Sequence, residues 1–332
     1  MNTTQEDIVF LPNDFDPLGD RQDINADKTF ADISMTHDII KRFCRNKGAI
    51  ISLAVILIIA VMSIIGPGMN QYSYSEMKTS FASLPPKVSA LSGIGAFDGT
   101  ENGKDMYALK GCDTDFWFGT DPLGRDLWTR LWTGTRVSLM IALIAAVGNM
   151  FIGIIYGLVS GYIGGKVDIV MQRIIEILNG IPSLVVMTLM VMVMRPGVGA
   201  IVVALLTTGW IGTARMVRGQ TMKIREEEFV QASQTLGAST FRILFKDALP
   251  NIMSQIITMA MFSIPGAIFA ESFLAFVGLG IPQPQPSLGI LISEGYKSLT
   301  IHPHMLVIPV LVLSVLMLSF NLLADGLRDA LD

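Results

Sequence analysis

Residues 223–251, KIREEEFVQASQTLGASTFRILFKDALPN, interrupt a strongly apolar chain with a polar stretch in which apolar residues recur at helical spacing. The first half predicts a short helix with one apolar face, made of Phe229, Ala232, Ser233 and Leu236 at i, i+3, i+4 and i+7. Gly237 is expected to end this helix, because glycine adopts positive φ at little steric cost. The acids 226–228 lie where the first turn begins, at the positive end of the helix dipole.

The second half predicts another short helix. Ser239 is a suitable N-cap, and Pro250 is expected to close the helix. The apolar face of this helix consists of Phe241, Leu244, Phe245 and Ala248. The stretch is therefore predicted to be a helix–turn–helix element with apolar surface on both arms.

The composition indicates an all-α integral membrane protein. Hydrophobic residues make up 51% of the 332-residue chain and charged residues only 16%. The formal net charge of −4 gives no reason to expect nucleic acid as a partner. Cys44 and Cys112 should lie on opposite sides of the first span and remain unpaired, and the three histidines are too few to predict a metal site.

Six apolar segments are predicted to cross the membrane, and lipid is therefore an expected partner. They are residues 49–65, 137–162, 168–194, 198–216, 252–277 and 305–323. Positive residues precede the first segment at 41–47 and follow the fourth at 215–225. Because such residues favour the inner side, we expect a cytoplasmic tail at 1–48, a cytoplasmic loop at 217–251 and a cytoplasmic C-terminus at 324–332.

The first loop, residues 66–133, is then extracellular and carries enough aromatic residues for a small folded cap. Asp121 as N-cap and Pro122 as first residue predict an interfacial helix near its end, with Trp128 and Trp132 as membrane anchors. Three arginines in this region, Arg125, Arg130 and Arg136, oppose the outer placement. The rule weakens for loops longer than about 60 residues, so the predicted topology stands.

Polar residues and prolines within the spans are candidates for a translocation pathway or gate. They are Asn179, Pro265 and Glu271. An acid inside a membrane costs roughly 2.5–3.5 kcal/mol on insertion scales, so Glu271 should face a bundle interior, a partner or water. An interhelical hydrogen bond explains it equally well. Gly153, Gly157 and Gly161 indicate close helix packing.

No catalytic residue and no nucleotide-binding signature is found in the sequence. The pattern G-x-x-x-x-G-K-[ST] occurs nowhere in the chain. If transport uses ATP, the ATPase must be another chain, so no cofactor is expected here.

The helix–turn–helix element resembles the coupling loop, or EAA motif, of permeases of ATP-binding-cassette (ABC) importers. The family pattern reads Glu-Ala-Ala, three residues, Gly, and later Leu-Pro; the matching positions here are Gln231, Ala232, Ser233, Gly237, Leu249 and Pro250. Gln231 and Ser233 depart from that pattern, and Glu228 is a candidate for the missing acid.

Further segments resemble the C-type subunit of the dipeptide/oligopeptide (and nickel) permease family. They are GTDPLGRDLWTRL at 119–131, SGYIGG at 160–165, ILNGIPSL in the third span, SFLAFVGLGIPQPQPSLGILI at 272–292 and FNLLADGLRDALD at 320–332. The resemblance covers about residues 118–332, and it places a permease core at 134–328.

This resemblance implies a multi-pass subunit of a bacterial cell membrane that imports oligopeptides or dipeptides. It implies a heterodimeric pore with a second, homologous permease, two cytoplasmic ABC ATPase subunits that bind ATP and Mg, and an extracellular or periplasmic peptide-binding protein. The residues expected to couple to an ATPase subunit are Glu228, Phe229, Gln231, Ala232, Ser233, Gly237, Ser239 and Phe241.

Other functions remain open from the sequence. A related permease could carry nickel or another small solute. A secondary, ion-coupled transporter would show inverted repeats and midplane ion ligands, for which Glu271 beside the Pro265-Gly266 pair is the only hint. A membrane scaffold or receptor would bind no ATPase subunit, and the polar stretch would then be an amphipathic hairpin on the membrane surface.

Overall fold

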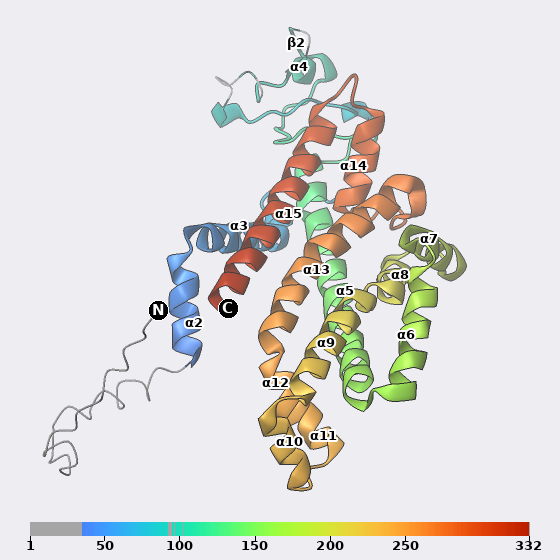
Figure 1. Ribbon diagram of the computed structural model, residues 1–332. Coiled ribbons are helices and arrows are strands. Elements are labelled where there is room, and N and C mark those ends of the chain that lie inside the picture. Colours follow the sequence, from blue (N-terminus) through green and yellow to red (C-terminus); the bar gives the residue numbers. More distant parts are fainter. Residues whose placement is uncertain (1–34, 92–94, 96, 102, 332) are drawn as a thin grey trace, which may run out of the picture.

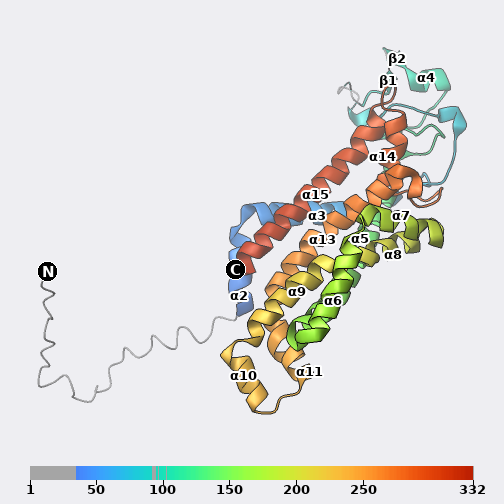
Figure 2. The same ribbon diagram turned by 45° about the vertical axis from the view of Figure 1, so that its right-hand side comes forward.

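Among the residues that the structure describes, five helical segments are long and apolar enough to cross a membrane on their own. They are α3 (Lys47–Ile65) with η2 (Gly66–Gly68), α5 (Leu127–Ile163), α8 (Val198–Thr208) with α9 (Trp210–Arg225), α13 (Met253–Leu274) with η6 (Ala275–Leu279), and α15 (His304–Leu331). Figures 1 and 2 show α5 in the middle of this bundle.

The structure is a computed structural model that describes residues 35–91, 95, 97–101 and 103–331. Most of the predicted tail therefore lies outside the described residues. The described part of the tail contains the helix α2 (Met35–Arg45), which leads into α3. Both cysteines are free, as predicted: Cys44 is exposed and Cys112 is buried in the cap.

The third predicted span is broken. The helices α6 (Gly165–Asn179) and α7 (Ser183–Met194), which cover the predicted span 168–194, meet at an angle of 80° near Pro182. Pro182 lacks an N–H group and disfavours the helical conformation of Ile181, which interrupts the helix at this point. If the bent pair counts as one span, the described part of the chain contains six, the predicted number.

The helices α5 and α9 approach closely because glycines line their contact. A Cβ atom at Gly153 would lie 2.6 Å from Thr213, one at Gly157 2.6 Å from the carbonyl of Ala214, and one at Gly161 2.7 Å from the carbonyl of Arg218. These distances are shorter than real Cβ contacts, so only glycine permits this approach. The predicted role of these glycines in helix packing is confirmed.

Two spans extend beyond their predicted ends. The fourth was expected to end at 216, but α9 continues to Arg225, because Val217 and Thr221 pack against α5. The last was expected to end at 323, but α15 continues to Leu331. Apolar composition therefore marked the apolar part of each helix and missed its polar end.

The loop after α3 folds into a small cap, as predicted from its aromatic content. Its elements are η3 (Thr79–Phe81), η4 (Ser89–Leu91), the antiparallel strands β1 (Thr100–Glu101) and β2 (Lys104–Asp105), and α4 (Met106–Lys110). Leu84, Tyr107 and Phe116 are buried at its centre. The Tyr107 hydroxyl donates to the carbonyl of Pro85 at 2.9 Å, and burial raises the pKa of this phenol.

The predicted interfacial helix is not a separate element. Its residues Trp128 and Trp132 belong to the first turns of α5, and Asp126, rather than Asp121, caps that helix by accepting from the Thr129 N–H at 2.8 Å. The prediction that Asp121 caps this helix was wrong, because its carboxylate is engaged by arginines described below. The indole N–H of Trp128 donates to the carbonyl of Gly66 at 2.8 Å, so the start of α5 is joined to the end of α3.

The cap and the polar element lie at opposite ends of the molecule (Figures 1 and 2). The polar element comprises α10 (Glu228–Thr235), α11 (Thr240–Arg242), η5 (Ile243–Ala248) and α12 (Leu249–Asn251). Near the cap, α14 (Leu288–Lys297) packs against both α5 and α15. The helical bundle therefore separates the cap at one end from the polar element at the other.

Replacing Gly157 tests the close approach of α5 and α9. Gly157→Ala should lower the melting temperature of the purified protein, because overpacking costs about 1–3 kcal/mol. Gly212→Ala is the matched control, since Gly212 is also helical but its Cβ would meet open space. The control should be neutral or stabilising. Equal melting temperatures for both variants would contradict the packing described here.

Candidate functional site

The polar element, residues 228–251, is half anchored and half exposed. Val230, Ile243 and Leu244 are buried. Leu244 packs with Leu158 of α5 and Val217 of α9. The element is therefore attached to the two helices that approach most closely.

The opposite side presents an apolar surface. Phe229, Leu236 and Phe241 are 45%, 88% and 71% exposed. On the second arm, the ring centroids of Phe241 and Phe245 lie 4.5 Å apart, and Phe245 is 39% exposed. Of the small residues in the predicted stripe, Ala232 is exposed and Ser233 is half-buried. We call Phe229, Leu236, Phe241 and Phe245 the outer apolar surface.

The turn between the two arms has the predicted form. Gly237 adopts φ +78°, in the left-handed region that favours glycine, and a Cβ there would meet no other atom within 4 Å. The N–H of Ala238 donates to the carbonyl of Ser233 at 3.0 Å, which closes the end of α10. The Ser239 hydroxyl caps α11 by accepting from the N–H of Arg242 at 3.4 Å.

Gln231 occupies the acidic position of the family pattern and Glu228 is the candidate for the missing acid, and the two side chains have different surroundings. Gln231 donates through its side-chain amide to the carbonyl of Glu226 at 3.0 Å, which ties the start of α10 to the end of α9. Glu228 is exposed at the first residue of α10. Gln234 reaches the Tyr162 hydroxyl at 3.4 Å. The Gln231 amide therefore bonds to the backbone just before α10, while the Glu228 carboxylate is exposed.

The second arm ends at Asn251, one residue after Pro250, close to its predicted end. The helix continues through Pro250 as α12, and a π-helical turn, η5, precedes it. The N–H of Leu249 donates to the carbonyl of Leu244, five residues earlier. This wider turn accommodates a proline ring that would otherwise meet the carbonyl four residues before it.

Glu271 joins three elements in the interior. Its side chain is completely buried on α13 and accepts from the Ser138 hydroxyl of α5 at 2.9 Å. The same hydroxyl accepts from the backbone N–H of Leu288, the first residue of α14, at 3.1 Å. Of the two sequence-based explanations, the interhelical hydrogen bond is present, and a role in a pathway stays a prediction.

The other two pathway candidates are not brought together with Glu271. Asn179 is exposed at the last residue of α6, where the bend begins. Pro265 is buried on α13, which continues through it to Leu274. Six residues separate Pro265 from Glu271, so the two do not share a helical face.

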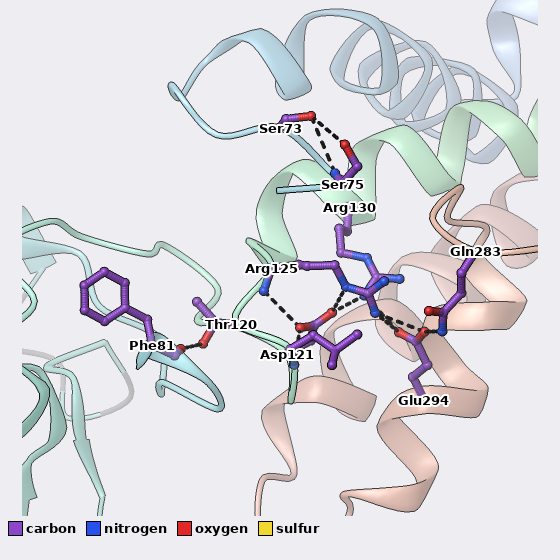
Figure 3. A network of polar contacts seen from close by, with 10 residues as sticks. Ser73, Ser75, Phe81, Thr120, Asp121, Arg125, Arg130, Gln283 and Glu294 are labelled. Carbon is purple, nitrogen blue, oxygen red and sulfur yellow. Dashed lines mark hydrogen bonds and ion pairs between the residues drawn. The ribbon is translucent and has the colours of Figure 1, made fainter. Parts of the chain in front are cut away.

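Sequence reasoning missed a buried ionic cluster at the cap end (Figure 3). Asp121 accepts from Nε of Arg125 at 2.6 Å and pairs with Nη1 of Arg130. Glu294 of α14 approaches both arginines, with distances of 3.3 Å to Arg125 and 2.9 Å to Arg130. Gln283 donates to Glu294 at 3.0 Å. The cluster joins the loop before α5 to α14.

The cluster explains the arginines that opposed the predicted outer placement of this loop. Arg125 is 1% and Arg130 0% exposed, and two carboxylates balance their charge. They are structural ion pairs rather than free positive charges of the kind that set topology. The spacing of Asp121 four residues before Arg125 was a usable signal for part of this cluster; the partner Glu294 is too distant in sequence to be found that way.

Comparison with known families identifies the fold. Residues 153–332 match the family described as binding-protein-dependent transport system inner membrane component, and residues 34–86 match the N-terminal TM domain of oligopeptide transport permease C. The chain belongs to this permease family. The first match includes the polar element and the bent pair α6–α7 of the permease.

Curated relatives agree over almost the whole permease. It is 41% identical to the dipeptide transport system permease protein DppC of Bacillus subtilis, over 97% of this chain and 93% of that one. It is 40% identical to the oligopeptide transport system permease protein OppC of the same organism, over 90% of each chain. Identity to OppC of Escherichia coli is 37%, over 90% and 91%. The resemblance predicted from the sequence is confirmed.

A solved structure supports the fold. An inward-facing conformation of the MetNI methionine ABC transporter matches with a TM-score of 0.53 and 20% identity, covering 62% of this permease and 97% of that chain. The permease is thus a multi-pass, all-α membrane protein with the helical arrangement of an ABC importer subunit.

Neutralising Asp121 should destabilise the cap end. Asp121→Asn leaves two buried guanidinium groups with one carboxylate, and breaking a buried pair costs about 3–5 kcal/mol. We expect a clear fall in the melting temperature of the purified protein. Glu294→Gln should cost less, because the Glu294 side chain is 21% exposed and water can replace part of its role. A wild-type melting temperature for Asp121→Asn would show that the cluster does not hold the cap.

Glu271→Gln tests the pathway prediction against the interhelical bond. The amide keeps the size of the side chain and an acceptor for Ser138 but removes the charge. If the charge serves transport, this variant should assemble normally and transport more slowly. Normal transport by Glu271→Gln, with reduced expression of Glu271→Leu, would leave Glu271 as a helix tie only.

Proposed function

We propose that this permease forms one half of the translocation pore of an ATP-driven importer of oligopeptides or dipeptides. The cargo is inferred from its relatives, which are named dipeptide and oligopeptide transport permeases. Those names favour peptides over nickel, and none of them denotes a secondary transporter. A second, homologous permease would complete the pore.

The proposal places ATP hydrolysis on partner chains. The sequence contains no G-x-x-x-x-G-K-[ST] loop to cradle phosphates. Two cytoplasmic ABC ATPase subunits would bind ATP and Mg, and they would have to transmit their motion through a contact with this chain. A surface for such a contact must be exposed, rigidly attached and outside the membrane.

The outer apolar surface of residues 228–251 meets these requirements and is the observation that carries the proposal. Its largest side chains are exposed, although charged residues surround them in the sequence: Glu226, Glu227, Glu228, Arg242 and Lys246. Exposed apolar patches bordered by polar residues mark docking sites. Phe229, Ala232, Leu236 and Phe241 would contact the ATPase subunit, with Ala232 and Ser233 permitting close approach.

The proposed orientation follows from the charges and the two ends of the bundle. Positive residues at 215–225 lead into the polar element, which would place this element and both termini in the cytoplasm of a bacterial cell. The cap lies at the other end (Figure 2) and would face the peptide-binding protein outside. ATP-driven closure of the ATPase subunits would tilt the core helices and expose the pathway to alternate sides.

Gly237 offers a direct test of the coupling role. A β-branched residue at positive φ is strained by about 1–3 kcal/mol, and about 1.4 kcal/mol corresponds to tenfold in affinity. Gly237→Val should therefore leave membrane levels near normal, reduce co-purification of the ATPase subunits and uncouple ATP hydrolysis from peptide uptake. Because no neighbouring atom would meet the new Cβ, backbone conformation alone is tested.

Two variants serve as controls. Gly237→Asn should retain most coupling, because asparagine tolerates the left-handed conformation better than valine. Ser233→Ala restores the residue of the family pattern and should be tolerated. If Gly237→Val transports normally with its ATPase subunits attached, residues 228–251 are not the coupling element.

A further inference from the structure

The helix α9, which leads into the polar element, also packs along its length against α5. α9 ends at Arg225 and α10 begins at Glu228, so α10 is joined to α9 through a connection of only two residues. α9 lies against α5 through Gly153, Gly157 and Gly161, whose contacts leave no room for a side chain. α5 and α9 are therefore one unit at the cytoplasmic end.

An ion pair extends this unit to α6. Arg218 of α9 binds Asp168 of α6 through two parallel contacts, Nε to Oδ1 at 2.5 Å and Nη2 to Oδ2 at 2.6 Å. Such bidentate pairs fix orientation as well as distance. The hydroxyl of Ser160, buried on α5, donates to Oδ1 of the same carboxylate at 2.6 Å. Asp168 thus touches both helices of the unit.

The remaining attachments of α6 are few for a helix of this length. Ile175 is buried against Trp210 and Ile211 of α9. The Tyr156 hydroxyl of α5 donates to the carbonyl of Met171 at 2.7 Å, and the Gln172 amide donates to the Ser160 hydroxyl of α5 at 3.2 Å. Much of the apolar surface of α6 is exposed in this chain, including Ile169, Val170, Ile174 and Ile177. The pair at Asp168 is the attachment nearest the polar element, and α6 continues through the 80° bend into α7.

We propose that the Asp168–Arg218 pair is a positioning contact that makes the bent pair α6–α7 move with α9 when the ATPase subunits act on α10. The inference rests on the proposed function of residues 228–251, and it adds a path from that element to the broken span. Loss of the pair would lower the ratio of peptide transported to ATP hydrolysed. It would not affect docking of the ATPase subunits, which we place on the outer apolar surface.

The first test uses the complete transporter reconstituted in proteoliposomes, with peptide uptake and ATP hydrolysis measured together. Asp168→Asn and Arg218→Gln should each lower the amount of peptide transported per ATP about fivefold. A change of this size corresponds to the free energy of a partly exposed ion pair, about 1 kcal/mol. ATPase subunits should co-purify at wild-type levels. The exchange of both residues, Asp168→Arg with Arg218→Asp, should restore at least half of the coupling.

The matched control is Arg173→Gln. Arg173 and Glu176 form an equally short ion pair of 2.6 Å on α6, but it joins residues of the same helix and is exposed. This control should couple normally. If it uncouples as strongly as Asp168→Asn, or if the single variants at 168 and 218 couple normally, the proposed contact is not the link.

The second test measures movement. Spin labels at the exposed residues Val170 of α6 and Met222 of α9 report the distance between the two helices. In the wild-type transporter this distance should be the same without nucleotide and in the ATP-trapped state, and in Asp168→Asn it should differ between the states. A wild-type distance that changes on ATP binding overturns the inference. Loss of ATPase binding or of ATP-driven uptake in the wild-type complex would instead contradict the proposed function.

Discussion

The close approach of α5 and α9 is the contact on which the other features of the permease depend. Three glycines one turn apart remove the side chains that would separate the helices. In a membrane no hydrophobic force drives helices together, so close packing of backbones and interhelical hydrogen bonds must hold them. The polar element is anchored on both helices through Leu244. Its outer surface can therefore be exposed without becoming mobile relative to the bundle.

The two ends of the bundle differ in which side chains they bury and which they expose. At the cap end, Asp121, Arg125, Arg130 and Glu294 bury balanced charge, which fixes the orientation of a loop that has little regular structure. At the other end, apolar side chains remain exposed and charged residues surround them. In the first arrangement, each of these charged side chains is paired within this chain. We propose that a partner covers the exposed apolar side chains of the second, and that this contact provides the coupling.

Several features could be predicted from the sequence because they depend on local physics. Apolar length located the membrane spans, and glycine and serine located the turn at Gly237 and the cap at Ser239. Other features depend on contacts between distant residues. The true start of α5 could not be predicted, because Asp121 binds arginines instead of capping the helix.

The prolines within helical segments also show that local sequence alone does not determine the outcome. Pro182 interrupts the third span, whereas Pro265 and Pro250 lie inside continuous helical segments. The sequence signal is alike at all three positions, and the surroundings decide the outcome: a preceding π turn accommodates Pro250. Likewise, periodicity identified the apolar stripe of α10, but only the fold shows that it faces away from the bundle while Val230 faces inward.

Site-specific photo-cross-linking in the assembled transporter tests the central claim most directly. A benzophenone side chain at Phe241, on the outer apolar surface, should form an adduct with an ATPase subunit. The same group at Leu109, which is 65% exposed on the cap, should form none with the ATPase. An ATPase adduct from Leu109, or the absence of any ATPase adduct from Phe241 in an active complex, would contradict the assignment of residues 228–251 as the coupling element.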